Sequence, residues 1–541
     1  MRSFRTSRRA WLRLAAGVTG ALALTRLAPP AEASVERAPL APRRAASAAA
    51  PAAYSVAAQG GGILRVADPF GAPSLDPIDA VTSYIIQYGL GEALVRITPQ
   101  GTVEPWLAES VMPIDPVRWR VRLRSGITFS NGRPIDAEAV RSSTLRVVER
   151  RKATANLLDL ASVEVVDGLT FDMVTRAPNG AFMASLGGAN LIVHDADAAV
   201  AMGDAAFAAA PVLTGPMIPT TFTPRELVVT RRNDTYWQGV PALSGTSHRA
   251  VSDGNARLAA VLAGDVDLAR QIPVQGVGQA RGAGLTVASG DEQAMNQIYF
   301  NCRAAPFDEV AVRQAVSLAI NRDALVVNVV EGSGSAATSV YPAFFPFADP
   351  TPYPYNPTHA GALLDAAGWT LGSDGMRSRG GQPLAFELLT YPQRPELGLL
   401  ATVIQSELAQ IGMTATIRNV EQITPIVNNR EYVATMYRLG TAPTADPGFI
   451  LNQAYASWGV DNGQIGYRSD EIDAITTRLN ATTDPAQRTQ VAQEALAILR
   501  RDMPTAPLLS PKLHIAYSPK VQGFNYHPFD FYFINHTLTL G

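Results

Sequence analysis

The residues of this chain that could act as catalysts or metal ligands are few and lie far apart in the sequence. The only cysteine, Cys302, follows the end of an expected strand and reads as a small structural residue. Histidines occur at six separate positions: His194, His248, His359, His514, His527 and His536. None has the spacing of an HExxH helix or of a cysteine–histidine zinc site. The sequence therefore predicts no catalytic constellation, no metal site and no cofactor.

Two short stretches come nearest to a reactive site. In the first, His194-Asp195-Ala196-Asp197, we interpret the carboxylates as helix caps in a solvated loop rather than as metal ligands. The second, 250–254, reads Ala-Val-Ser-Asp-Gly between an expected strand and an expected helix, which is the setting of a serine nucleophile elbow. Its first glycine is replaced by alanine, and Asp253 or Asn255 can simply cap the helix that follows. A secreted serine hydrolase using Ser252 remains the alternative function from another class.

Length and composition indicate an ordinary globular protein with more than one core. The chain has 541 residues, of which 47% are hydrophobic and 17% charged, with a formal net charge of −2. A chain of this length divides into two or three substructures. The charge balance lacks the basic excess of a nucleic-acid-binding protein, so we expect no nucleic-acid partner.

The first 33 residues have the pattern of an export signal. Arg8-Arg9 forms a twin-arginine pair, 14–24 is a weakly apolar run, and Ala31-Glu32-Ala33 is a cleavage signature. The apolar run is shorter than the roughly 20 residues that a membrane span requires. We predict twin-arginine export with cleavage after Ala33, followed by a disordered tether rich in alanine and proline at 34–59.

Several elements follow from periodicity. Strands are expected at 63–67, at 384–390 and near residue 298, where Gln297 and Tyr299 point to the face opposite Ile298 and Phe300. A helix is expected at 84–95, and 119–124 reads as an edge strand with a basic solvated face. The capping residues predicted for the helices are Asp136, either Asp253 or Asn255, Asp308 and Asn356.

The stretch 291–325, DEQAMNQIYFNCRAAPFDEVAVRQAVSLAINRDAL, resembles the extracytoplasmic solute-binding proteins of family 5, which serve peptide, opine and nickel ABC importers. Blocks at 61–110, 214–237 and 253–269 are similar to the same family, and the resemblance covers 60–541 in order. It implies no enzyme but a monomeric periplasmic protein that captures a small solute and delivers it to an inner-membrane ABC permease.

The resemblance also implies the fold class and its divisions. We expect an α/β, two-lobed periplasmic-binding-protein fold of class II type, with a hinge between the lobes and an extra β-rich subdomain. Lobe I would comprise 60–100, 213–295 and 506–541. The β-rich subdomain would be 101–212, and lobe II would be 296–505.

The resemblance places five candidate ligand-binding residues at the cleft between the lobes: Tyr84, Tyr391, Arg394, Asp446 and Trp458. The three aromatic side chains would form walls. Arg394 could bind a ligand carboxylate with two hydrogen bonds, and Asp446 could bind an ammonium group.

Both charged candidates also have a purely structural interpretation. Arg394 could form a salt bridge with Glu396 or Glu387, and Asp446, which precedes Pro447, could fix its own turn. The solute class is left between a peptide-like compound, which we favour, and a metal chelate of the nickel type. Pro443 stands near the position where peptide-binding relatives place an aspartate, and Gly440 precedes the Ala-Pro step where nickel-binding relatives carry a tryptophan.

Overall fold

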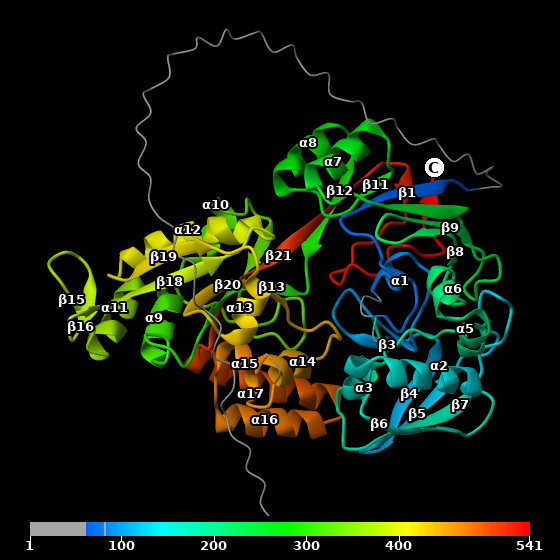
Figure 1. Cartoon of the computed structure of the whole chain (residues 1–541), viewed down its shortest axis with the longest axis horizontal. Helices are drawn as coiled ribbons and strands as arrows, with labels where there is room; N and C mark the ends of the chain where they lie inside the picture. Colours follow the sequence, from blue (N-terminus) through cyan, green and yellow to red (C-terminus); the bar gives the residue numbers. More distant parts are fainter. Residues whose placement is uncertain (1–60, 80–82, 190, 460) are drawn as a thin grey trace, which may run out of the picture. The chain divides into compact units, whose positions relative to one another are not determined.

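The computed structural model describes residues 61–79, 83–189, 191–459 and 461–541. The export signal and tether predicted for 1–59 lie outside these residues. Most of the described strands belong to one mixed sheet with the order β19-β18-β20-β13-β21-β11-β1-β10-β9-β8 (Figure 1). In that order its strands are Thr414–Asn419, Ala385–Thr390, Ala434–Gly440, Ala294–Phe300, Thr505–Tyr517, Leu268–Ala269, Ile63–Asp68, Gly245–Ala250, Leu227–Arg232 and Met217–Thr223. Two further strands, β12 (Thr286–Asp291) and β14 (Gly334–Ala336), also pair with β21.

The sheet contains two groups of parallel strands, one on each side of β21. In the first group β1 runs parallel to β10 and β11, and in the second β18 runs parallel to β19 and β20. Strand β21 joins the groups because it pairs with β13 through its first residues and with β11 and β12 through its last. The alternation of strands and helices confirms the predicted α/β class.

A separate four-stranded sheet lies within the segment predicted to be β-rich. Its order is β4 (Ala108–Asp115), β5 (Arg118–Leu123), β7 (Thr170–Thr175) and β6 (Leu160–Val165). The prediction that 119–124 forms an edge strand is wrong, since β5 pairs on both sides. Its basic face is neutralised by neighbouring strands: Arg120 donates two hydrogen bonds to Asp172, at 2.8 and 3.0 Å.

The remaining strands form small sheets: β2 (Val95–Ile97) with β3 (Val103–Pro105); β15 (Thr370–Leu371), β16 (Arg377–Arg379) and β17 (Gln382–Pro383); and β22 (Val521–Gln522) with β23 (Thr539–Leu540). The helices in the first half of the described chain are α1 Ser83–Gln87, α2 Ala137–Arg150, α3 Lys152–Leu158, α4 Phe182–Ser185, α5 Ala196–Met202, α6 Asp204–Ala209, α7 Gly254–Ala263, η1 Val274–Gly276 and α8 Val277–Gly282. Those in the second half are α9 Val310–Ala319, α10 Arg322–Asn328, α11 Pro357–Ala366, α12 Pro395–Ala409, α13 Ile423–Asn429, α14 Gly448–Ile450, η2 Leu451–Tyr455, α15 Asn462–Ile465, α16 Asp470–Ala481 and α17 Pro485–Asp502.

Three of the predicted helix caps are confirmed. The carboxylates of Asp136 and Asp253 and the amide of Asn356 each accept a hydrogen bond from the backbone N–H three residues on, at 2.7 to 2.9 Å. The cap predicted at Asp308 is wrong by one residue, because Glu309 precedes α9 and its side chain accepts no capping bond.

The helix predicted at 84–95 is wrong beyond its first turn. Helix α1 ends at Gln87, and Val95 already belongs to β2. Gly89 has a φ of 68°, which ends the helix in a left-handed conformation. Glu92 is buried and accepts hydrogen bonds from Trp106, Tyr236 and Trp237. Long-range partners therefore override the local helical pattern.

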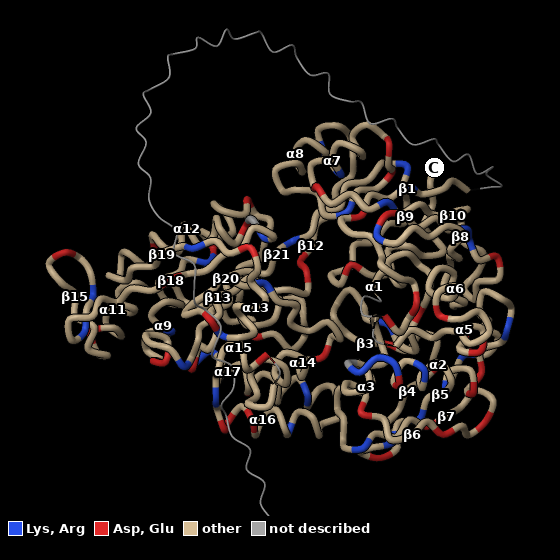
Figure 2. The backbone as a smooth tube through the Cα atoms, viewed as in Figure 1, with Lys and Arg blue, Asp and Glu red and all other residues tan. Residues whose placement is uncertain are grey.

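Hydrophobic side chains gather in separate clusters that follow the sheets. The large cluster packs along the mixed sheet, and a second cluster lies under the four-stranded sheet. Acidic and basic residues are interspersed along the described chain (Figure 2). A search of the described helices finds none with both the length and the apolar character of a membrane span.

Candidate functional site

The carboxyl ends of the two parallel groups converge on the middle of β21. Strand β20 ends at Gly440, which pairs with Ala294 of β13. Two residues before Ala294, the Glu292 N–H donates to the carbonyl of Pro511 in β21 at 2.9 Å. From the other side, β11 runs antiparallel to β21, and Ile272 beyond it donates to the His514 carbonyl at 2.9 Å. Ligands of open α/β sheets gather at the carboxyl ends of parallel strands. Both groups therefore present their binding ends to the same region.

The first half-site, which we define as Asp68, Tyr84, His248 and Arg270, lies at the ends of β1, β10 and β11. Asp68 accepts hydrogen bonds from Arg270 at 2.5 Å and is bonded to Nδ1 of His248 at 3.0 Å. Arg270 also forms an ion pair with Asp530. Burial alone would raise the pKa of Asp68, but Arg270 and His248 together hold the pKa below its usual value. The charges of this half-site are thus paired internally.

Tyr84 is the predicted ligand residue of this half-site. It is half-buried on α1 and lines a cavity of about 440 Å³ together with Phe70, Arg225 and Ser252. No hydrogen bond from the Ser252 hydroxyl to a histidine is found among the described residues. The Ser252 carbonyl accepts from Arg257 at 2.9 Å, while Asp253 caps α7. This geometry supports the capping interpretation of the stretch.

The second half-site, which we define as Gln297, Tyr299, Tyr391 and Tyr437, lies on β13 and β20 beside the end of β18. Tyr391 directly follows β18, and its ring centroid lies 6.2 Å from that of Tyr437. Gln297 pairs with Tyr437 across β13 and β20, so the two side chains share a face. The Tyr299 ring lies on the same face, 4.7 Å from that of Tyr437.

This face of β13 and β20 carries buried polar atoms without partners. They are Oε1 of Gln297, Oη of Tyr299, Oε1 of Gln293 and Oγ1 of Thr441, and none has a hydrogen-bond partner among the described residues. Gln293 and Thr441 lie just beyond the two strands, at positions that keep the two-residue spacing of this face. They are neighbours, since the Thr441 N–H donates to the Gln293 carbonyl at 3.0 Å. Buried polar groups in native proteins are normally paired. A polar solute would supply the missing partners.

Arg394 stands beside this half-site without an ion pair to the described residues. Both of its predicted structural partners are engaged elsewhere, since Glu387 bonds to Arg418 at 2.9 Å and Glu396 to Arg438 at 3.2 Å. Arg394 is half-buried and directly precedes α12, three residues after Tyr391. The structure therefore leaves its guanidinium available.

Asp446 is in a different situation, because Arg488 of α17 binds both of its oxygens. The three bonds measure 2.7, 2.8 and 3.0 Å, and Oδ1 also accepts from the Gly448 N–H at 2.7 Å. This arrangement matches the predicted turn-fixing role. Trp458 is 52% exposed, and its indole N–H points to Asn452 at 3.4 Å.

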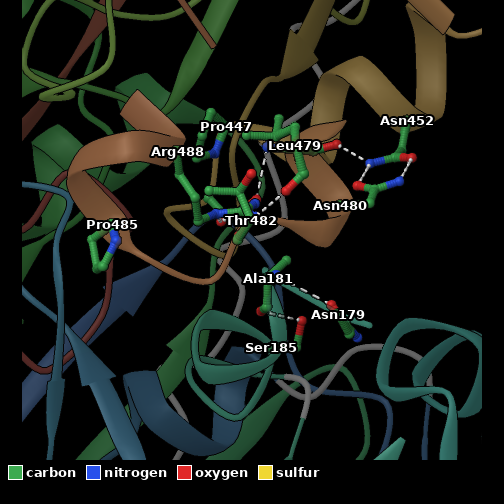
Figure 3. A network of polar contacts seen from close by, with 12 residues as sticks. Asn179, Ala181, Ser185, Pro447, Asn452, Leu479, Asn480, Thr482, Pro485 and Arg488 are labelled. Atoms are coloured by element: carbon green, nitrogen blue, oxygen red, sulfur yellow. Dashed lines mark hydrogen bonds and ion pairs between the residues drawn. The ribbon is translucent and has the colours of Figure 1, made fainter. Parts of the chain in front are cut away.

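Arg488 also belongs to a contact between the turn before α4 and the end of α16 with the connection that follows it (Figure 3). The Gly180 N–H donates to the Asn480 carbonyl at 2.7 Å, and Arg488 donates to the carbonyls of Leu479 and Thr482 at 2.6 and 2.7 Å. A Cβ at Gly180 would overlap both Thr482 and Arg488. We call this contact, formed by Gly180, Asn480, Thr482 and Arg488, the clamp. A cavity of about 510 Å³ lies beside it.

The sequence indicated Tyr391, Arg394 and Trp458 but not the partners that surround them. The sequence pattern at Gln297 and Tyr299 could have indicated a polar site. These polar side chains occupy alternate positions of a strand, β13, that is buried on both faces. No such pattern marked Arg270 and Asp68, because 202 residues separate them.

Comparisons with known proteins agree on one class. The family "Bacterial extracellular solute-binding proteins, family 5 Middle" matches residues 102–462. The nickel-binding protein NikA of Staphylococcus aureus is 26% identical over 479 residues, 88% of this chain and 94% of that protein. The glutathione-binding protein GsiB of Salmonella paratyphi A is 28% identical over 477 residues, 83% and 89% of the two chains. The crystal structure of a nickel ABC transporter from Bacillus halodurans is similar with a TM-score of 0.78, at 29% identity, over 89% of this chain and 100% of that one.

Proposed function

Because the chain belongs to the family 5 bacterial extracellular solute-binding proteins and is a substrate-binding component of an ABC importer, we propose that its solute is a peptide or a peptide-like compound. The unpartnered amides and hydroxyls beside the tyrosine rings of the second half-site carry this proposal. Peptide groups offer both donors and acceptors to such a surface. The similarity to a glutathione-binding protein supports the same class of solute.

A metal chelate of the nickel type is the second candidate solute. The names of the Staphylococcus and Bacillus relatives favour it. In the residues that the structure describes, no group of three or more histidine, cysteine, aspartate or glutamate side chains is arranged to hold a metal ion. Nickel offered with and without histidine therefore forms a separate arm of the test.

We propose that the solute is held between two lobes that close around it. Lobe I would comprise 60–100, 213–295 and 506–541, with the β-rich subdomain at 101–212, and lobe II would comprise 296–505. Strand β21 pairs with β11 of the first parallel group and with β13, which pairs with β20 of the second, and this supports a hinge in β21. A solute that touches both half-sites favours the closed form by its differential affinity, and the permease recognises that form.

We further propose that the protein is a periplasmic monomer exported by the twin-arginine route and cleaved after Ala33. The Arg8-Arg9 pair supports this route. Replacing both arginines with lysine should retain the precursor in the cytoplasm. N-terminal sequencing of the exported protein should begin at Ser34, and light scattering should give the mass of one chain.

A thermal-shift screen of the refolded mature chain tests the solute class. Its arms are di- to octapeptides, opines, nickel with and without histidine, and oligosaccharides. A solute at a hundredfold its dissociation constant adds about 2.7 kcal/mol to the stability of the folded state. Stabilisation by peptides supports the proposal. Stabilisation only in the nickel–histidine arm would replace it with the chelate, and stabilisation only by oligosaccharides would overturn both.

A further inference from the structure

A cavity of about 470 Å³ lies apart from both half-sites. Three segments line it: 86–106, which runs from α1 to just beyond β3; 216–238; and the C-terminal loop 525–537. The C-terminal loop passes beside α1 (Figure 1), where Ile534 approaches Gly89 closely. All three segments belong to the proposed lobe I or to the start of the β-rich subdomain, so a ligand held in this cavity would not bridge the two lobes.

The ionisable groups that line this cavity carry no uncompensated charge. Burial raises the pKa of the Glu92 carboxyl group, which already accepts three hydrogen bonds from neighbouring aromatic side chains. Arg96 forms an ion pair with Glu104 at 2.5 Å and lies 3.9 Å from the centroid of the Trp106 ring. Burial lowers the pKa of His527 to about 4, so this side chain is neutral at pH 7. A charged ligand would therefore find no free counter-charge here.

Neutral polar groups, by contrast, remain available in the cavity wall. The buried Oη of Tyr532 has no hydrogen-bond partner among the described residues. Gln238 lies 3.3 Å from the Tyr236 hydroxyl, but the single proton of that hydroxyl is in the shorter bond, 2.7 Å, to Glu92. The His536 side chain forms no hydrogen bond with the described residues, and its ring centroid lies 5.9 Å from that of Tyr236. The wall thus offers both donors and acceptors beside an aromatic ring.

The backbone of the C-terminal loop is strained where it presents Tyr532. Asp530 and Tyr532 have φ angles of 59° and 56°, in the left-handed region that residues with a Cβ rarely adopt. The conformation is held by surrounding contacts, since Asp530 forms an ion pair with Arg270 and donates its N–H to the His527 carbonyl at 2.8 Å. Strain of this kind is concentrated at binding and catalytic sites. It marks the Tyr532 side of the cavity as a place where a ligand binds.

We propose that this cavity is a second binding site and takes a neutral cyclic polyol of the size of a monosaccharide. The hydroxyl groups around the rim of a pyranose ring would bond to Tyr532, Gln238 and His536. Its C–H groups would pack against Tyr236 and Phe531. The volume lies in the range of about 300–1,000 Å³ that is typical of small-molecule sites. The proposal goes beyond the proposed function, because this ligand would bind outside the cleft.

Titration calorimetry with the folded mature chain tests the site. The ligands are the methyl glycosides of glucose, galactose and mannose, and myo-inositol. We expect at least one of them to bind one molecule per chain with a dissociation constant below about 1 mM. Gluconate and glucosamine should bind at least tenfold more weakly than the corresponding neutral sugar, because a buried charge without a partner is costly.

Two variants locate the ligand. Tyr532→Phe and Gln238→Leu should each weaken polyol binding about fivefold, as expected for one hydrogen bond. The melting temperature of Tyr532→Phe should not fall, because the variant removes a buried hydroxyl that has no partner. A hydroxyl with a purely structural role would give the reverse result, with stability lost and binding unchanged. Tyr355→Phe and Gln410→Leu make the same substitutions at exposed positions and should bind the polyol as the wild type does.

The failures of the two proposals give different results. A folded chain that binds none of the four polyols would overturn this inference, and so would binding that is equal in the wild type, Tyr532→Phe and Gln238→Leu. Equal affinity for the neutral and charged sugars would overturn the ligand class. A chain that binds polyols in this cavity but binds no peptide would overturn the proposed solute and leave this inference intact.

Discussion

The two half-sites occupy equivalent places in the sheet but treat their charges in opposite ways. In the first, Asp68, His248, Arg270 and Asp530 pair their charges with one another, and only Nε2 of His248 and Nε of Arg270 have no hydrogen-bond partner among the described residues. In the second, Gln297 and Tyr299 end in unpartnered atoms, and Arg394 nearby forms no ion pair with the described residues. Equivalent topology therefore does not imply equivalent function. Internal pairing of the charges favours a structural role for the first half-site, which we call the anchor, and the unpaired groups of the second support the proposal that it contacts the solute.

The largest expected effect comes from breaking the anchor. Arg270→Gln leaves Asp68 buried with a weakened set of partners, and removal of one member of a buried ion pair costs about 3–5 kcal/mol. Urea denaturation should show that loss in the free energy of unfolding. Arg141→Gln breaks the exposed pair with Glu138 and should cost less than about 1 kcal/mol. Equal losses in the two variants would contradict the anchor.

Acid should destabilise the folded protein through two buried histidines outside both half-sites. Burial lowers the pKa of His194 to about 4 and that of His527 to about 4. In the unfolded chain the histidine pKa is roughly 6.5, so between pH 4 and pH 6.5 the unfolded chain binds more protons than the folded protein. The contribution of these histidines to the free energy of unfolding is therefore complete above pH 6.5 and is lost as the pH falls toward 4.

The loss between these two pH values is on the order of 3 kcal/mol for each histidine. Unfolding measured from pH 7 to pH 4 should become less dependent on pH in His194→Gln. The exposed His359→Gln is the control and should follow the wild type. A pH profile unchanged by His194→Gln would count against this assignment.

The clamp tests whether solute binding requires contact between the turn before α4 and the end of α16 with the connection that follows it. Gly180→Ala introduces a Cβ that overlaps Thr482 and Arg488, so the clamp must open. We expect about tenfold weaker solute affinity, equivalent to about 1.4 kcal/mol. Gly168→Ala is the matched control, since no atom lies within 4 Å of its added Cβ. Unchanged affinity in Gly180→Ala would show that the clamp is independent of binding.

The smallest effect is expected at Trp458, whose side chain is 52% exposed. Trp458→Phe keeps an aromatic surface but loses the indole N–H and part of the contact area. Solute affinity should fall by a few-fold, roughly 0.5–1 kcal/mol. Tryptophan fluorescence should change when solute binds to the wild type and change less in the variant. An identical response would place Trp458 outside the site.

Sequence patterns predicted local features better than partners. The caps at Asp136, Asp253 and Asn356 were correct because each acts within three residues of its own helix. The helix expected at 84–95 was wrong because Glu92 is drawn into hydrogen bonds with Tyr236 and Trp237, far along the chain. Tyr391 and Arg394 were placed correctly in a loop after a strand, but their neighbours could not be named.

The sequence by itself determined the α/β class, several strands of the large sheet and three helix starts, since these depend on periodicity and on capping within a few residues. Only the tertiary structure decided which charges remain unpaired. Asp446 and Arg394 both lie in loops that follow strands. Asp446 forms an ion pair with Arg488, 42 residues away, whereas no acidic side chain of the described residues pairs with Arg394. The physical reason is that ion pairing depends on distances set by packing of the whole sheet, to which local sequence contributes little.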